Sequence, residues 1–104
     1  MIEVHLDTTY PIEVSYYKED SYYVVTQNES AICSFYTDLD NRPNNSVLCF
    51  ANSKSKNCEY SYITFYENHL EVLHNKFKLT TLQYTEEDIK EAFSILNIKI
   101  KEVT

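Results

Sequence analysis

Hydrophobic and polar residues alternate along much of this chain, which is typical of β-structure. Ile2, Val4 and Leu6 alternate with Glu3 and His5, and a period of two places one set on a buried face and the other on an exposed face. Similar alternation, or a short run rich in β-branched and aromatic residues, predicts further strand segments. They are Ile12–Tyr16, Tyr22–Thr26, Ala31–Tyr36, Val47–Ala51, Tyr60–Tyr66, Leu70–Leu73, Phe77–Leu82 and a last short strand at Ile98–Ile100.

Polar segments between the strands predict how some of them pair. Lys18–Ser21 is a polar turn that joins the segments on either side of it into a hairpin, and His74-Asn75 does the same for its two neighbours. Asp38–Asn45 is rich in Asp and Asn and contains a proline, which predicts a loop. Val47–Ala51 is continuously apolar, which predicts a central strand buried on both faces.

One helix is predicted near residues 86–96. Thr85 supplies an N-cap hydroxyl, Asp88 stands three residues further on as in a capping box, and Asn97 suits the left-handed conformation that ends a helix. An apolar stripe at positions i, i+3, i+4 and i+7 would dock the helix on a sheet. It consists of Ile89, Ala92, Phe93 and Leu96. We therefore expect a mainly β (α+β) fold, an antiparallel sheet or sandwich of about seven to eight strands with one C-terminal helix.

Length and composition narrow the class of protein. A chain of 104 residues predicts a single domain, residues 1–104. The N-terminus has acids where a signal peptide has basic residues, and no segment is apolar enough to span a membrane, so we expect a cytoplasmic protein. The chain has no glycine, so asparagine must take positions with positive φ. Glycine-dependent phosphate loops and dinucleotide fingerprints are excluded for the same reason.

The negative charge lies in the first part of the chain. The formal net charge is −7, and residues 1–41 hold eight acids against the single base Lys18, whereas residues 42–104 hold eight of each. One interpretation is solubility, since net charge keeps small proteins dispersed. The other is that the acids of residues 1–41 gather on one face, which attracts a basic partner and speeds association. No Lys/Arg patch is visible, so direct binding of nucleic acid is not expected.

Candidate catalytic and metal-binding residues do not form a recognisable pattern. Cys33 and Cys49 stand among apolar residues, and with Cys58 they make an odd number that suits reduced thiols, although a Cys49–Cys58 bridge stays open. The cysteine spacings match no zinc motif, and His69 and His74 would lie on opposite faces of a strand. A Cys–His pair that meets only in the fold stays possible. We expect no catalytic residue, metal or cofactor, and a small enzyme is the least favoured class.

Tyrosines and acids together suggest a partner-binding surface. Six of the ten tyrosines lie in the acidic first part. Adjacent tyrosines cannot both point inward on one strand, so one of each pair should face outward, where a rigid aromatic ring is a good binding contact. Plain strand propensity is the alternative explanation. The predicted partner-binding residues are Glu13, Tyr16, Tyr17, Glu19, Asp20, Tyr22, Tyr23, Asp38 and Asp40.

In its size, acidity, lack of glycine and Tyr-rich strands, the chain resembles the small immunity proteins of bacterial contact-dependent growth inhibition and polymorphic toxin systems. The resemblance covers the whole length and includes no motif. It implies a cytoplasmic inhibitor that covers the active site of one cognate toxin domain, often a basic nuclease. The alternative is a phage-encoded inhibitor of a host defence nuclease, of the anti-CRISPR type, in which acids mimic nucleic acid.

Overall fold

Nine strands and one α-helix form within the residues that the computed structural model describes, which are 2–51, 60–74 and 77–103. The strands are β1 (Ile2–Asp7), β2 (Ile12–Tyr17), β3 (Tyr22–Gln27), β4 (Ser30–Tyr36), β5 (Ser46–Ala51), β6 (Tyr60–Phe65), β7 (Leu70–His74), β8 (Phe77–Leu82) and β9 (Ile100–Val103). The helix α1 spans Glu86–Ile95, and a short 3₁₀ turn spans Lys18–Asp20. A mainly β fold with one C-terminal helix is thus confirmed, with nine strands in place of about seven to eight.

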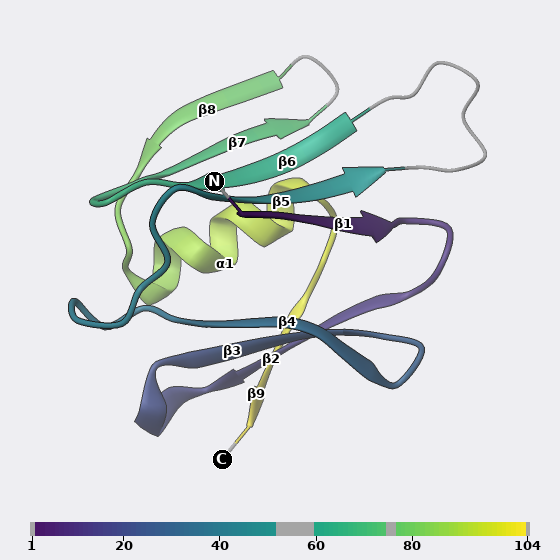
Figure 1. Ribbon diagram of the computed structural model, residues 1–104, viewed down its shortest axis with the longest axis horizontal. Coiled ribbons are helices and arrows are strands. Elements are labelled where there is room, and N and C mark those ends of the chain that lie inside the picture. Colours follow the sequence, from purple (N-terminus) through teal and green to yellow (C-terminus); the bar gives the residue numbers. More distant parts are fainter. Residues whose placement is uncertain (1, 52–59, 75–76, 104) are drawn as a thin grey trace.

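The strands form two mixed sheets (Figure 1). The five-stranded sheet has the order β1-β5-β6-β7-β8, and the four-stranded sheet has the order β4-β3-β2-β9. The β2–β3 and β7–β8 hairpins are present as predicted; the turn of the second lies outside the described residues. The β1–β5 and β2–β9 pairs are parallel, which the expectation of antiparallel pairing missed. Each of these pairs joins strands far apart in sequence, as a parallel pair requires.

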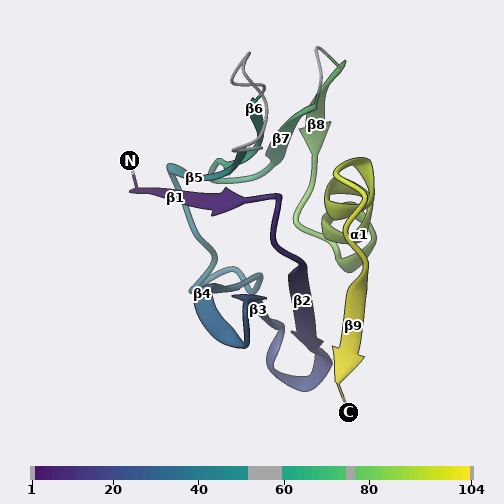
Figure 2. The same ribbon diagram turned by 90° about the vertical axis from the view of Figure 1, so that its right-hand side faces the viewer.

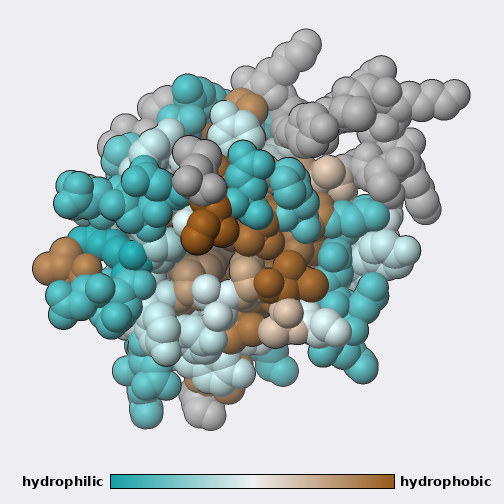
Figure 3. All heavy atoms as spheres, in the orientation of Figure 1, coloured by the Kyte–Doolittle hydropathy of each residue, from teal (hydrophilic) through white to brown (hydrophobic). Residues whose placement is uncertain are grey.

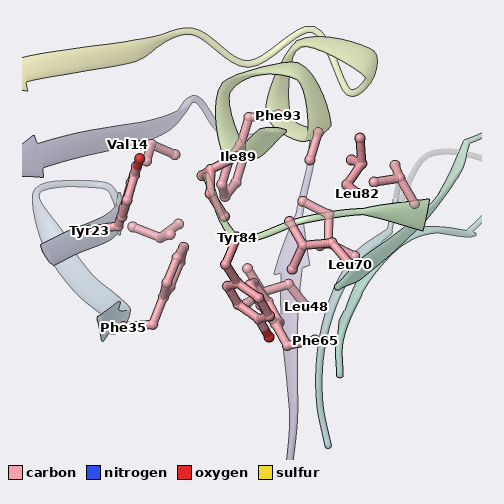
Figure 4. Close-up of a cluster of buried hydrophobic side chains, with 14 of the residues drawn as sticks. Val14, Tyr23, Phe35, Leu48, Phe65, Leu70, Leu82, Tyr84, Ile89 and Phe93 are labelled. Carbon is pink, nitrogen blue, oxygen red and sulfur yellow. The ribbon is translucent and has the colours of Figure 1, made fainter. Parts of the chain in front are cut away.

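The two sheets enclose one core, and the helix closes one side of it. In Figure 2, α1 lies on the same side as β8 and β9, whereas β1 and β4 form the edges on the opposite side. Side chains from both sheets and from the helix meet between these layers (Figure 4). They include Val14, Tyr23 and Phe35 from the four-stranded sheet, Leu48, Phe65 and Leu70 from the five-stranded sheet, and Ile89 and Phe93 from α1.

The helix follows its sequence signals closely. The Oγ1 atom of Thr85 accepts a hydrogen bond from the backbone N–H of Asp88 at 3.2 Å, which satisfies one of the free N–H groups of the first turn. The Thr85 hydroxyl also donates to the Asp88 carboxylate. Ile89 and Phe93 are buried, and Asn97 has a φ of 61° just past the helix end, as predicted.

Strand β5 is internal, as its apolar run predicts, but its outer face is only partly buried. Leu48 and Phe50 are 4% and 2% exposed and face the core. On the outer face Val47 is 9% exposed, whereas Cys49 is half-buried. The outer face of this sheet lies away from the helix and the second sheet (Figure 2).

Within the described residues, no helix is long and apolar enough to cross a membrane.

Asparagine takes most of the positive-φ positions in this glycine-free chain. Asn28, Asn45 and Asn97 have φ values of 54°, 58° and 61°. Ser21 and Glu29 also adopt positive φ, at 49° and 64°. The expectation that asparagine replaces glycine is confirmed at three turns, and it missed two residues that are less suited to the left-handed region.

Candidate binding surface

Three tyrosines form a row across the outer face of the four-stranded sheet. Tyr17 lies opposite Tyr22 on the β2–β3 pair, and Tyr22 lies opposite Tyr36 on the β3–β4 pair. The ring centroids are 6.0 Å apart in the first pair and 4.6 Å apart in the second. Tyr17 and Tyr36 are 38% and 42% exposed, and the half-buried Tyr22 lies between them. We call these three residues the tyrosine row.

The other member of each adjacent tyrosine pair lies in the core. Tyr16 and Tyr23 are 7% and 1% exposed, and their rings stack with centroids 4.3 Å apart. Burial, together with Tyr16 and Glu86 nearby, raises the pKa of Tyr23. One tyrosine of each pair therefore faces outward, as predicted. Tyr16 and Tyr23 themselves were wrongly included among the partner-binding residues, because strand alternation turns them inward.

Acidic side chains stand beside the tyrosine row, at the end of the sheet where β2 and β4 finish. Glu19 and Asp20 are exposed in the 3₁₀ turn that connects Tyr17 to Tyr22. The backbone N–H of Thr37 donates to the backbone carbonyl oxygen of Ser21 at 2.9 Å. This hydrogen bond holds the start of the loop that follows β4 beside the turn. That loop contains Asp38 and Asp40, two more of the predicted partner-binding acids, and brings them toward the same end of the sheet.

Asp38 and Asp40 differ in how free they are to meet a partner. Asp40 is exposed, whereas Asp38 is half-buried. The carboxylate of Asp38 accepts a hydrogen bond from the side chain of Asn41 at 2.7 Å, and its backbone oxygen accepts from the N–H groups of Asn41 and Arg42. Asp38 therefore shapes the loop, and Asp40 is the acid this loop offers to solvent.

The other acids of residues 1–41 lie elsewhere, so the expectation that all of them gather on one face is wrong. Glu13 and Glu29 line a small hollow together, and four residues of extended β2, about 13 Å, separate Glu13 from Tyr17. Glu3 and Asp7 belong to β1 in the other sheet, where Glu3 lies 3.4 Å from His5. These acids lie on different parts of the surface because strand pairing separates residues that are close in sequence.

The thiols have little nucleophilic character. Cys33 and Cys49 are half-buried, and burial raises the pKa of Cys33 from 9.0 to about 11. Burial and the nearby Glu3 also raise the pKa of Cys49. Both thiols are therefore protonated at neutral pH, and the thiolate is the reactive form. The Cys49–Cys58 bridge that the sequence left open involves residue 58, which lies outside the described residues.

A serine–histidine contact was not found by sequence reasoning. The Oγ atom of Ser61 lies 2.6 Å from Nδ1 of His74 across the β6–β7 pair. Both residues line a pocket of about 340 Å³ with Tyr10 and Asn97. The only sequence signal is that the two residues become neighbours once β6 and β7 are paired in register. Ser61 is 8% exposed, and a hydrogen bond to imidazole satisfies its buried hydroxyl, so we assign the pair a structural role.

The three histidines belong to three different environments. His5 lies beside Glu3, His69 stacks on Tyr66 with ring centroids 4.7 Å apart, and His74 contacts Ser61. Within residues 2–51, 60–74 and 77–103, no three His, Cys, Asp or Glu side chains are grouped in a way that could hold a metal ion.

Comparison of this chain with protein-family models, with curated proteins and with solved structures found no match. The candidate site is therefore defined by the geometry of the chain itself, the tyrosine row with Glu19, Asp20 and Asp40 beside it.

Proposed function

We propose that this protein is a cytoplasmic immunity protein. It binds a basic toxin domain and covers the active site of that domain. The resemblance to the immunity proteins of polymorphic toxin systems favours a nuclease as the toxin. The observation that supports this function is the tyrosine row. It is a strip of partly exposed aromatic rings on an open sheet face, with acids beside it at one end of the sheet. The protein acts as a stoichiometric inhibitor, with no turnover and no cofactor of its own.

Aromatic rings and acids contribute to binding in different ways. Tyrosine offers much contact area for few rotatable bonds, and buried aromatic contacts at the centre of an interface dominate its free energy. In the row, Tyr22 is held between its two neighbours, so little side-chain entropy remains to be lost on binding. Exposed carboxylates act at longer range, where they attract a positive cleft and raise the association rate.

The rival function, a nucleic-acid mimic that blocks a defence nuclease, has less support. A mimic of a phosphate backbone needs carboxylates spaced along a continuous strip. Here the acids of the first part divide between opposite ends of the four-stranded sheet and the β1 strand. Such a pattern suits a compact docking site at one end better than an extended phosphate track.

The proposal predicts that the gene immediately upstream encodes the toxin domain, and that domain is the partner for the test. Co-expression is expected to restore growth to a host that makes the toxin domain, and the purified proteins are expected to form a one-to-one complex without nuclease activity. Absence of binding, or growth rescue without a complex, would contradict the proposal.

A matched pair of tyrosine variants locates the surface. Tyr36→Ala removes an exposed ring of the row, and we expect dissociation to become faster by about tenfold or more, the size of a hot-spot contact. Tyr10→Ala removes an even more exposed ring, 51% exposed, in the β1–β2 loop outside the row. Equal effects of the two substitutions on dissociation would show that the row is not the docking surface.

A further inference from the structure

The four outermost strands of the two sheets differ in how they are protected against pairing with another chain. Edge strands expose free backbone N–H and C=O groups, and natural proteins usually guard them with charged residues or proline. Strand β1 contains Glu3 and Asp7, β8 contains Lys78, and β9 contains Lys101 and Glu102. Strand β4 (Ser30–Tyr36, sequence SAICSFY) contains neither charge nor proline. Its pairing with β3 shifts register at Ile32, so the regular and unguarded part of this edge is Cys33–Tyr36.

The backbone of β4 is available on its outer side. Within the described residues, β4 pairs with β3 alone. The N–H of Thr37 points toward β3, since it donates to Ser21. Backbone N–H and C=O groups of successive residues point to opposite sides of a strand. The N–H and C=O groups of Ser34 and Tyr36 therefore face the free side of β4. Ser34 and the 40% exposed Ile32 are accessible there, so an incoming strand meets no charged side chain along this edge.

An apolar groove runs beside this edge. It has a volume of about 290 Å³ and separates β4 from β1, the edge strand of the other sheet. Figure 3 shows hydrophobic side chains gathered at the centre of this face, between the positions of β1 and β4 in Figure 1. The groove is lined mainly by apolar side chains, among them Ile2, Val4, Cys33, Phe35 and Pro43. Ile2 is 70% exposed at its mouth.

We propose that an extended segment of the basic partner adds to the free edge of β4 and becomes the fifth strand of the four-stranded sheet. The inference rests on the proposed function and deepens it. Alternate side chains of the added strand would enter the apolar groove, and the others would lie on the outer face beside Tyr36 and extend the tyrosine row. The segment that fits therefore alternates apolar with basic residues.

Charge favours a basic partner over a second copy of this chain. Two copies, each with a net charge of −7, repel one another. Antiparallel pairing of β4 with itself would also bring Glu29, just before the strand, toward Asp38 and Asp40, which follow it in the partner copy. Opposed like charges destabilise paired strands. A Lys- or Arg-containing strand reverses the sign of each of these contacts.

A synthetic peptide tests the edge without the natural partner. The probe is an acetylated octapeptide that alternates valine and lysine, added at up to about 1 mM to the isotope-labelled protein. We expect backbone amide signals of Ser34 and Tyr36 to shift and their hydrogen exchange to slow, while the amide of Lys101 on β9 stays unchanged. An octapeptide that alternates valine and glutamate is the matched control and is expected to leave all three amides unchanged.

Two substitutions at one position separate backbone pairing from side-chain contact. Ser34→Pro removes the N–H group on the free side, which an edge strand tolerates, and is expected to abolish peptide binding. Ser34→Ala keeps the N–H group and is expected to bind the peptide as the natural chain does. Thermal unfolding checks the fold of both variants. If Ser34→Pro does not fold, Ile32→Lys replaces it and places a guarding charge on the edge.

The outcomes separate this inference from the proposed function. Unchanged amides at Ser34 and Tyr36 with the valine–lysine peptide, or changes at β9 instead, overturn the edge inference even when the toxin domain binds. A dimer whose Ser34 amide is protected before peptide is added overturns it as well. Peptide binding at β4 that is lost in Ser34→Pro supports the inference, and a toxin domain that then fails to bind contradicts only the proposed function.

Discussion

The hydroxyl oxygen of Tyr84 lies 2.5 Å from the backbone oxygen of Tyr66. It lies 2.9 Å from the backbone oxygen of Pro43 as well, so a single hydroxyl proton serves two carbonyl groups. The guanidinium group of Arg42 lies over the ring of Tyr84, 4.7 Å from its centroid. This one core residue thus anchors the 37–45 loop, which contains Asp38 and Asp40 of the candidate surface.

Loss of this hydroxyl is expected to destabilise the protein. Tyr84→Phe keeps the ring but leaves two carbonyl groups without their donor, and we expect the free energy of unfolding to fall by about 1–2 kcal/mol. Tyr17→Phe removes a hydroxyl from a partly exposed ring and is expected to change stability by less than about 0.5 kcal/mol. Urea unfolding measures both. Equal effects would show that the Tyr84 hydroxyl does not stabilise the loop.

Stability is expected to fall at alkaline pH. Burial raises the pKa of Cys33 from 9.0 to about 11 and, against a smaller opposing effect of Arg42, raises the pKa of Tyr84 from 10.0 to about 12. The unfolded chain then loses these protons at lower pH than the native protein. The stabilisation that the two protonated groups contribute to the native protein is complete below pH 9. As the pH rises, the contribution of Cys33 is lost between 9 and about 11, and that of Tyr84 is lost between 10 and about 12.

Two variants separate the contribution of Cys33 to this pH dependence from that of Tyr84. Cys33→Ala is expected to make the first part of the decline shallower, and Tyr84→Phe the second part, in urea unfolding measured across the alkaline range. Cys49, Tyr16 and Tyr23, whose pKa values burial also raises, keep their own contributions in both variants. The absolute stability of either variant is not the test, since each substitution also changes packing. A decline that is the same in both variants and in the natural chain would contradict the assignment to these two groups.

Local sequence signals predicted most of the secondary structure because each signal acts over a few residues. Alternation marked the strands, and Thr85 with Asp88 marked the start of the helix. The parallel β1–β5 pair was missed because it joins segments about 40 residues apart in the chain, and no local pattern specifies such a partner. Likewise, Ser61 and His74 became neighbours only through the register of β6 and β7.

The orientation of the tyrosines was only partly accessible from sequence. Tyr16 shares its face with Val14, and Tyr17 shares its face with Glu13, so alternation alone points Tyr16 inward. No such asymmetry exists for Tyr22 and Tyr23, because Val24 and Val25 follow them with one on each face. The positions of the acids on the surface were harder to predict than the orientation of the tyrosines. Their positions depend on which strands pair and where loops cross between sheets, which residue type does not encode.

Glu29 is expected to be a site where glycine stabilises the protein. It has a φ of 64° in the two-residue turn between β3 and β4, where hairpins favour glycine. A residue with a Cβ atom costs about 1–2 kcal/mol in this conformation, and the extra freedom of glycine in the unfolded chain offsets about 0.5–1 kcal/mol. We therefore expect Glu29→Gly to raise the free energy of unfolding by about 0.5–1 kcal/mol. Glu29→Gln keeps the Cβ atom, and a similar gain from it would attribute the effect to charge.

The acids beside the tyrosine row are expected to control the association rate with the toxin domain. The double substitution Glu19→Lys with Asp20→Lys changes the net charge from −7 to −3, and so does Glu13→Lys with Glu91→Lys, two exposed acids outside the row and the β4 edge. Asp38 is left unchanged because its carboxylate accepts a hydrogen bond from Asn41. If the docking surface is the row and its neighbouring acids, the first pair slows association more than the second.

Ionic strength shows whether that difference is electrostatic. The Debye length falls from about 10 Å at 0.1 M salt to about 3 Å at 1 M, so the rate constants of the two double variants are expected to converge at high salt in stopped-flow measurements. Dissociation is expected to respond to Tyr36→Ala far more than to either charge reversal, because the desolvated ring acts only after contact. Equal slowing by both double variants at low salt would mean that the partner senses net charge alone, and it would remove the acids beside the row from the docking surface.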